Sequence, residues 1–218
     1  IIGKIRIGDG VFGSNDGDFG TTGGEDSVSF TNTGTWQVSG QIEQGPEGTT
    51  IGSGAFSVNE TNGADATVLI ENSGTVEIVD ASMFLGVDTF DNAGGTIDLT
   101  ADANATDTTL SIFFGTAPGG PSVATFFGQT DENNQVSTVS VDASLGADSQ
   151  GSLASDNLVI TNDKADGVTR IDVNDTQSGT AGVYAPVGVE VVRVDAGEET
   201  EAGAFTLSTG PINKGLWA

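Results

Sequence analysis

A repeat of about twenty residues is the feature that most constrains what this chain can fold into. Each unit reads apolar, any, Asn or Gly, any, Gly, small, apolar, polar, apolar, and the last unit has one extra residue at Gly94–Gly95. The units are residues 30–38, 50–58, 70–78 and 90–99. A unit this short cannot bury its apolar residues alone, so the repeat predicts that successive units stack on one another.

The pattern inside each unit predicts strands joined by turns. The last three positions alternate apolar, polar, apolar, which is typical of a β-strand. The Asn-x-Gly before them is typical of a turn, because both residue types tolerate positive φ. The chain is therefore predicted to be all-β, a single-stranded parallel β-helix (a solenoid) with coils about 4.8 Å apart. A sandwich or barrel of evenly spaced hairpins is the alternative, and turn spacing alone does not exclude it.

Stacking makes specific positions equivalent within residues 28–100. Asn32, Asn72 and Asn92 are expected to form part of an amide ladder. The four glycines expected at equivalent corners are Gly34, Gly54, Gly74 and Gly95. The side chains expected to point inward in one column are Trp36, Phe56, Val76 and Ile97, and those expected to point outward are Gln37, Ser57, Glu77 and Asp98.

Composition excludes several kinds of chemistry. Without Cys or His, the chain has no disulfides, no imidazole metal site and no His-dependent triad. Lys and Arg number 6 against 31 acidic residues, a formal charge of −25, so nucleic acid and anionic membranes are not expected partners. No apolar run approaches the ~18 residues that span a bilayer, so no direct membrane insertion is expected. An export signal or anchor is expected outside this sequence.

Residues 136–218 carry a second pattern, in which the strands lengthen and the strict repeat fades. The segments that define it are Ser155–Asp–Asn–Leu–Val–Ile–Thr161, Gly188–Val–Glu–Val–Val–Arg–Val194, Ala204–Phe–Thr–Leu207 and Gly215–Leu–Trp–Ala218. In order and spacing they resemble the C-terminal, pertactin-like region of autotransporter passengers. That resemblance implies a right-handed β-helix of coils over residues 1–135 and an autochaperone-type cap over residues 136–218. It also implies a membrane β-barrel beyond the fragment.

The resemblance also carries an expected function. In type V secretion the barrel on the same chain is the partner that holds the passenger at the cell surface, outside the outer membrane. The chain is expected to be a non-enzymatic stalk or adhesin scaffold that meets a host or neighbouring-cell surface. A β-helical carbohydrate-active enzyme, a phage-type spike, and a surface-layer or filament subunit remain alternatives. Because the C-terminal region has the longest β-branched runs, it is also predicted to be the most stable part and to template the coils before it.

No residue is predicted to be catalytic, to bind a cofactor or to hold a metal. The carboxylate pairs Asp16 and Asp18, Asp148 and Asp156, and Asp172 and Asp175 have no special context in so acidic a chain. Residues 15–18 and 131–134 gather oxygen donors, but neither segment completes an EF-hand loop, so solvated turns are the preferred interpretation. Calcium binding there stays open. Phe113–Phe114 and Phe126–Phe127 are interpreted as two strands that each bury one Phe.

Overall fold

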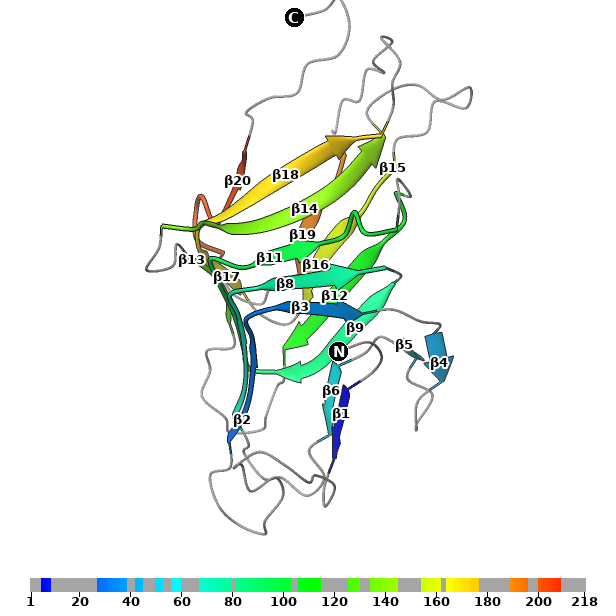
Figure 1. Ribbon diagram of the computed structural model, residues 1–218, viewed down its shortest axis with the longest axis vertical. Coiled ribbons are helices and arrows are strands. Elements are labelled where there is room, and N and C mark those ends of the chain that lie inside the picture. The colour runs from blue at the N-terminus through cyan, green and yellow to red at the C-terminus, as the bar shows by residue number, and fades with distance from the viewer. Residues whose placement is uncertain are drawn as a thin grey trace, which may run out of the picture.

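The computed structural model covers residues 1–218 and is all-β in the part of the chain that it describes (Figure 1). The described residues are 5–8, 27–38, 42–44, 50–52, 56–59, 67–79, 81–102, 106–114, 125–129, 134–144, 154–161, 164–176, 189–195 and 200–208. Nearly all of their strands belong to three parallel sheets, which we call A, B and C.

Each sheet collects short strands from along the chain. Sheet A contains β3 (Thr35–Val38), β8 (Thr75–Ile78), β11 (Thr96–Asp98), β14 (Ser137–Ser144), β18 (Thr169–Asp175) and β20 (Phe205–Leu207). Sheet B contains β1 (Ile5–Gly8), β6 (Phe56–Asn59), β9 (Ser82–Val87), β12 (Thr109–Phe114), β16 (Asn157–Thr161) and β19 (Val192–Asp195). Sheet C contains β2 (Ser27–Asn32), β7 (Thr67–Asn72), β10 (Thr89–Ala93), β13 (Thr125–Gln129) and β17 (Lys164–Gly167).

The chain visits the sheets in the fixed order C, A, B from β7 to β19, and we call one such passage a circuit. In Figure 1 the strands of sheet A follow one another along the long axis in chain order. Within each sheet the neighbouring strands are parallel, as the repeat predicts. Two antiparallel pairs lie outside this order: β4 (Ile42–Gln44) with β5 (Thr50–Gly52), and β15 (Ala154–Ser155) with β14.

The register confirms three of the four repeat units and corrects the other. Ile70 pairs with Phe90, twenty residues on, but Phe30 pairs directly with Ile70, forty residues on. The unit at residues 50–58 is therefore not a stacked copy of the others. Its first strand, β5, pairs with β4, and its second, β6, belongs to sheet B. The placement of Phe56 in one column with Trp36 is wrong, because Phe56 pairs with Phe84 and Trp36 pairs with Val76.

The interior column of sheet A holds the other three predicted residues. Trp36 is 2% exposed, and Val76 and Ile97 are fully buried. Val139 and Ile171 continue the column in β14 and β18. Their outward neighbours Gln37, Glu77 and Asp98 are half-buried, as the alternation predicts. The side chains of Phe56 and Ser57 lie outside the described residues.

The predicted amide ladder is present at the corner between sheets C and A. Asn32 Nδ2 donates to Asn72 Oδ1 (2.8 Å), and Asn72 Nδ2 donates to Asn92 Oδ1 (2.6 Å). Asn92 Nδ2 donates in turn to the Ser137 hydroxyl (2.7 Å), which lies 3.3 Å from that of Thr169. All five side chains are buried, so the ladder satisfies polar groups that would otherwise be costly inside the protein.

A stack of aromatic rings fills the space between the sheets. The rings are in contact in the order Phe30, Trp36, Phe84, Phe90, Phe126 and Phe205, with neighbouring centroids between 4.6 and 6.2 Å apart. Phe114 and Phe126 are both buried, as the interpretation of two Phe-burying strands predicts. Sheets A, B and C all contribute rings, so the stack joins the three sheets into one core.

The division at residue 135 remains a prediction. Pairs that cross it exist in all three sheets, namely β11 with β14, β12 with β16, and β13 with β17. The higher stability expected of residues 136–218 is likewise a matter for experiment.

The close approach of glycines at the corner between sheets C and A leads to a first prediction. A Cβ on Gly74 would overlap the Gly34 carbonyl oxygen and lie 2.7 Å from the Gly34 nitrogen, whereas a Cβ on Gly34 would meet nothing within 4 Å. We expect Gly74→Ala to lower the free energy of unfolding by about 2 kcal/mol, because backbone atoms must shift to admit the methyl group. Urea unfolding measures the change. The matched variant Gly34→Ala should be neutral or slightly stabilising, and equal losses in both would contradict the stacked corner. Gly54 lies outside the described residues.

Candidate functional site

Three acidic side chains gather where the chain passes from sheet A to sheet B. Asp142 lies in β14, Asp156 lies between β15 and β16, and Asp102 lies in the turn that follows β11. We call Asp102, Asp142 and Asp156 the acidic corner. Asp142 and Asp156 are the fully buried carboxyl groups among the described residues, and Asp102 is half-buried, so the chemistry of this corner is the first question about function.

Asp156 acts as a cross-link between two circuits. Its Oδ1 accepts a hydrogen bond from the Thr108 N–H (3.1 Å), and its Oδ2 accepts one from the Asp142 N–H (2.7 Å). Its own N–H donates to the Asp142 carbonyl (2.9 Å). The carboxyl group therefore takes the place of a neighbouring strand, and it joins the end of β14 to the start of β12.

The other two carboxyls of the corner are only partly satisfied. Asp142 is 1% exposed, and its Oδ1 accepts from Asn174 Nδ2 (2.5 Å). Asp102 Oδ2 accepts from the Thr108 hydroxyl (2.9 Å). Asp142 Oδ2 and Asp102 Oδ1 are buried and have no hydrogen-bond partner among the described residues.

Burial dominates the electrostatics of this corner. Loss of solvent raises the pKa of Asp156 to about 7, against the lowering effect of its two backbone N–H donors. The like charges of Asp142 and Asp102 raise it further. Outside this corner, Asp88 lies between β9 and β10. Its carboxyl group accepts a hydrogen bond from the Val68 N–H (2.6 Å), and burial raises its pKa above the ordinary value.

The acidic corner has the chemistry of a structural link. Asp156 has no exposed surface, so a substrate cannot reach it in this conformation. Both of its oxygens accept backbone hydrogen bonds, which fix the carboxyl group between the end of β14 and the start of β12. Across the described part of the chain, no group of three or more acidic residues has the geometry to hold a metal.

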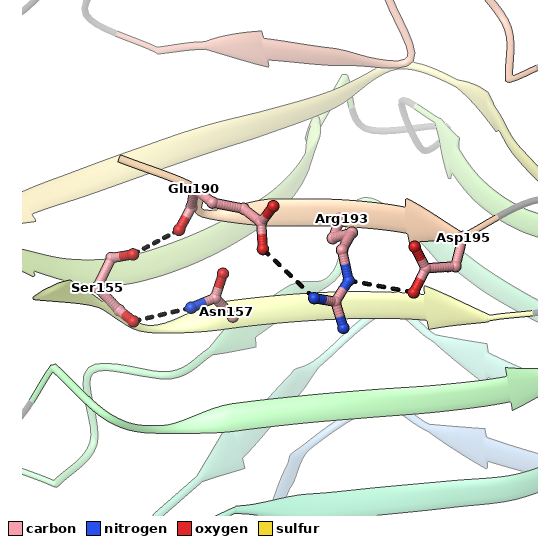
Figure 2. Close-up of polar contacts among 5 residues, drawn as sticks. All are labelled: Ser155, Asn157, Glu190, Arg193 and Asp195. Atoms are coloured by element: carbon pink, nitrogen blue, oxygen red, sulfur yellow. Dashed lines mark hydrogen bonds and ion pairs between the residues drawn. The ribbon is translucent and has the colours of Figure 1, made fainter. Parts of the chain in front are cut away.

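A second polar group lies on the exposed face of sheet B near the C-terminal end (Figure 2). Arg193 projects from β19 between two acids, with its Nε 3.1 Å from Asp195 Oδ2 and a terminal nitrogen 3.8 Å from Glu190 Oε1. The Ser155 hydroxyl donates to the Glu190 carbonyl, and Asn157 Nδ2 donates to the Ser155 carbonyl (2.9 Å). The three charged side chains are about half exposed, so these ion pairs add little stability.

Acids on the outer faces are hydrogen-bonded between neighbouring circuits. Glu71 accepts from Thr31 (2.9 Å), Glu77 accepts from Gln37 (3.2 Å), and Asp91 accepts from Gln129 (3.1 Å). These contacts place a polar partner beside part of the chain's negative charge, and they give the outer surface a regular polar pattern.

The residues singled out in the sequence are dispersed. Asp16, Asp18 and Asp148, with residues 15–18 and 131–133, lie outside the described residues. Asp172 and Asp175 are three positions apart on β18, so they point to opposite faces of sheet A. Asp156 belongs instead with Asp102 and Asp142, which spacing along the chain did not indicate. The local sequence carried no signal for this cluster, because acids are spread along the whole chain.

No family model, curated protein or solved structure matches this chain. Within the described residues, no helix is long and apolar enough to cross a membrane.

Proposed function

We propose that the chain is a right-handed parallel β-helix from the passenger of an autotransporter, with a C-terminal capping region. In this proposal it is a non-enzymatic scaffold, a stalk or adhesin support, that lies outside the outer membrane. A β-barrel on the same chain holds it there. The observation that carries the proposal is the fixed C, A, B order of parallel strands around one continuous core.

The side chains that fill the interior support the role of a scaffold. The space between the sheets is filled by stacked aromatic and aliphatic side chains, and the buried amides hydrogen-bond one another. The buried carboxyl Asp156 is engaged by backbone groups. Each circuit thus adds length and surface, which is what a stalk requires.

The sequence motifs supply the link to secretion. The segment that resembles the passenger motif, Ser155–Thr161, lies in β15 and β16, and the next motif ends in β19. These two strands are neighbours in sheet B, since Leu158 pairs with Val192 and Ile160 pairs with Val194. A chance similarity to the two motifs would not require their strands to pair, so this pairing supports the resemblance.

The proposal predicts that intact cells of the source organism display this chain. Antibodies raised against residues 1–218 should label unpermeabilised cells, and added protease should remove the signal while a cytoplasmic marker survives. Labelling that appears only after lysis would contradict the proposal. The purified chain should also release no reducing ends from a panel of polysaccharides, and such release would favour the carbohydrate-active alternative.

A further inference from the structure

The two ends of the strand stack are stepped in the described part of the chain, and the steps are complementary. The first circuit consists of β2, β3 and β6, and the last consists of β17, β18 and β19. Sheet B has one more strand before the first circuit, β1, whereas sheet A has one more strand after the last circuit, β20. These two strands lie toward opposite ends of the long axis in Figure 1. Relative to sheet A, sheet B is therefore one strand longer at the N-terminal end and one strand shorter at the C-terminal end.

The C-terminal step exposes apolar residues beside an open strand edge. β19 is the last strand of sheet B among the described residues, and β20 is the last strand of sheet A. Val194 is half-buried, although Ile160 opposite it in β16 is fully buried. Leu207 in β20 is 48% exposed, although Ile171 opposite it in β18 is buried. Both exposed residues continue interior columns, so a further layer of strands would cover them.

Sheet C is closed at the same end. The Thr200 hydroxyl accepts from the Ala165 N–H (3.4 Å), and the Glu201 carboxylate accepts from the Gly167 N–H (3.2 Å). The Glu201 N–H donates to the Ala165 carbonyl (3.2 Å). Thr200 and Glu201 thus take the place of a strand beside β17, and the open edges at this end belong to sheets A and B.

The strand that fits the step in sheet B is β1 of a second copy. It alternates apolar and polar residues, Ile5–Arg–Ile–Gly8. The register of sheet B runs from β1 through β6, β9, β12 and β16 to β19. In that register Ile5 has the position of Val194, and Arg6 has the position of Asp195. A second copy stacked in the same register therefore sets an apolar residue beside an apolar one and a cation beside an anion.

We propose that the C-terminal end of one copy binds the N-terminal end of a second copy, with β1 of the second copy added as a parallel strand to the open edge of β19. The added strand fills the step next to β20, and it completes the circuit that Thr200, Glu201 and β20 begin. The two joined surfaces differ, so the contact is heterologous and repeats with each added copy, which gives a head-to-tail filament. The junction does not depend on the passenger function, because it uses only the strands at the two ends.

The ends of the aromatic stack fit the same junction. Its first ring, Phe30, and its last ring, Phe205, are partly buried, whereas the rings between them are buried. Phe30 belongs to β2 and Phe205 to β20, which lie on the two surfaces that the junction joins. A second copy thus continues the core as well as the sheets.

Sedimentation velocity of the purified chain tests the assembly. The measurement covers protein concentrations from about 1 μM to about 1 mM, in about 0.5 M salt to screen repulsion between the acidic chains. We expect the average mass to keep rising beyond the dimer, and electron micrographs to show unbranched rods one stack wide. A mass that stays at one copy, or levels off at two as in a closed dimer, would overturn the proposal.

A pair of variants at one position tests the addition of a strand. The Leu158 N–H donates to the Val191 carbonyl, so the backbone groups of Val194, three positions on, face the open edge of β19. Val194→Pro removes the N–H at that edge and should weaken assembly about tenfold. Val194→Ala also shortens the side chain but keeps the N–H, so it should assemble better than the proline variant. Equal assembly by the two variants would contradict strand addition.

A charge exchange tests the register and serves as its own folding control. Arg6→Asp and Asp195→Arg each put like charges at every junction, so each variant alone should associate about fivefold more weakly. An equimolar mixture should recover, because each junction between the two variants joins opposite charges. The ion pair of Asp195 with Arg193 lies within one copy and does not change on mixing, so it cannot explain a recovery. A mixture no better than its components would overturn the proposed register. Labelling of intact cells tests the passenger function separately, so either proposal can fail without the other.

Discussion

Ile97→Asp is expected to leave the protein largely unfolded at neutral pH. Ile97 is fully buried at the centre of the sheet A column, between Val76 and Val139. Loss of the aliphatic side chain alone, as in Ile97→Ala, costs about 2–5 kcal/mol. An aspartate there adds the cost of a buried, unpaired carboxyl, which brings the total close to the whole stability of a typical domain, about 5–15 kcal/mol. Circular dichroism and urea unfolding would measure the loss.

The matched control lies one residue away on the same strand. Thr96 points to the outer face, so Thr96→Asp adds the same charge where water can solvate it. We expect that variant to unfold within about 1 kcal/mol of the wild type. Equal losses at Thr96 and Ile97 would show that the strand does not alternate between core and solvent.

Asn72→Asp is expected to cost about 3 kcal/mol or more, although it changes only one atom of the side chain. Asn72 accepts from Asn32 and donates to Asn92 Oδ1 and to the Thr96 carbonyl (3.3 Å). An aspartate keeps the acceptor and loses both donations, so two buried oxygens face it without a hydrogen between them. Thermal unfolding at pH 7 would report the loss.

Glu71, the residue before Asn72, provides the control, with a carboxylate replaced by an amide. Glu71→Gln also swaps one oxygen for an amide nitrogen, but at an exposed contact with Thr31. Its effect should stay within about 0.5 kcal/mol. If Asn72→Asp were as mild, the ladder would contribute nothing to stability.

The ladder and the column were predictable because stacking repeats a residue type at a fixed register. Asn32, Asn72 and Asn92 share one position of the repeat, and each hydrogen-bonds its neighbour. The same rule exposes the error at residues 50–58. That unit has Gly52 where the others have Asn, and glycine has no side chain to join a ladder. Its alternation was a correct sign of a strand, but alternation does not say to which sheet a strand belongs.

The acidic corner was beyond prediction for a different physical reason. Asp102, Asp142 and Asp156 come from three stretches that only the stacking of circuits brings together. In a chain with 31 acids, nothing in the local sequence distinguishes a carboxyl that is buried from one that is solvated. The cross-link made by Asp156 depends on where β11 stops, since the carboxyl takes the place that a longer β11 would have occupied.

The order of strands in the sheets makes the length of the stack depend on the number of circuits and not on the number of residues in each circuit. Phe90 is paired with Ile70 twenty residues before it and with Phe126 thirty-six residues after it, yet each pairing advances the sheet by one strand spacing of about 4.8 Å. The paired strands thus keep the same register although the numbers of residues between them differ. A gene encoding this architecture can therefore gain or lose whole surface loops while the reach of the protein stays constant. Conversely, two such proteins of equal mass can differ in the distance they span, because that distance depends on the number of circuits.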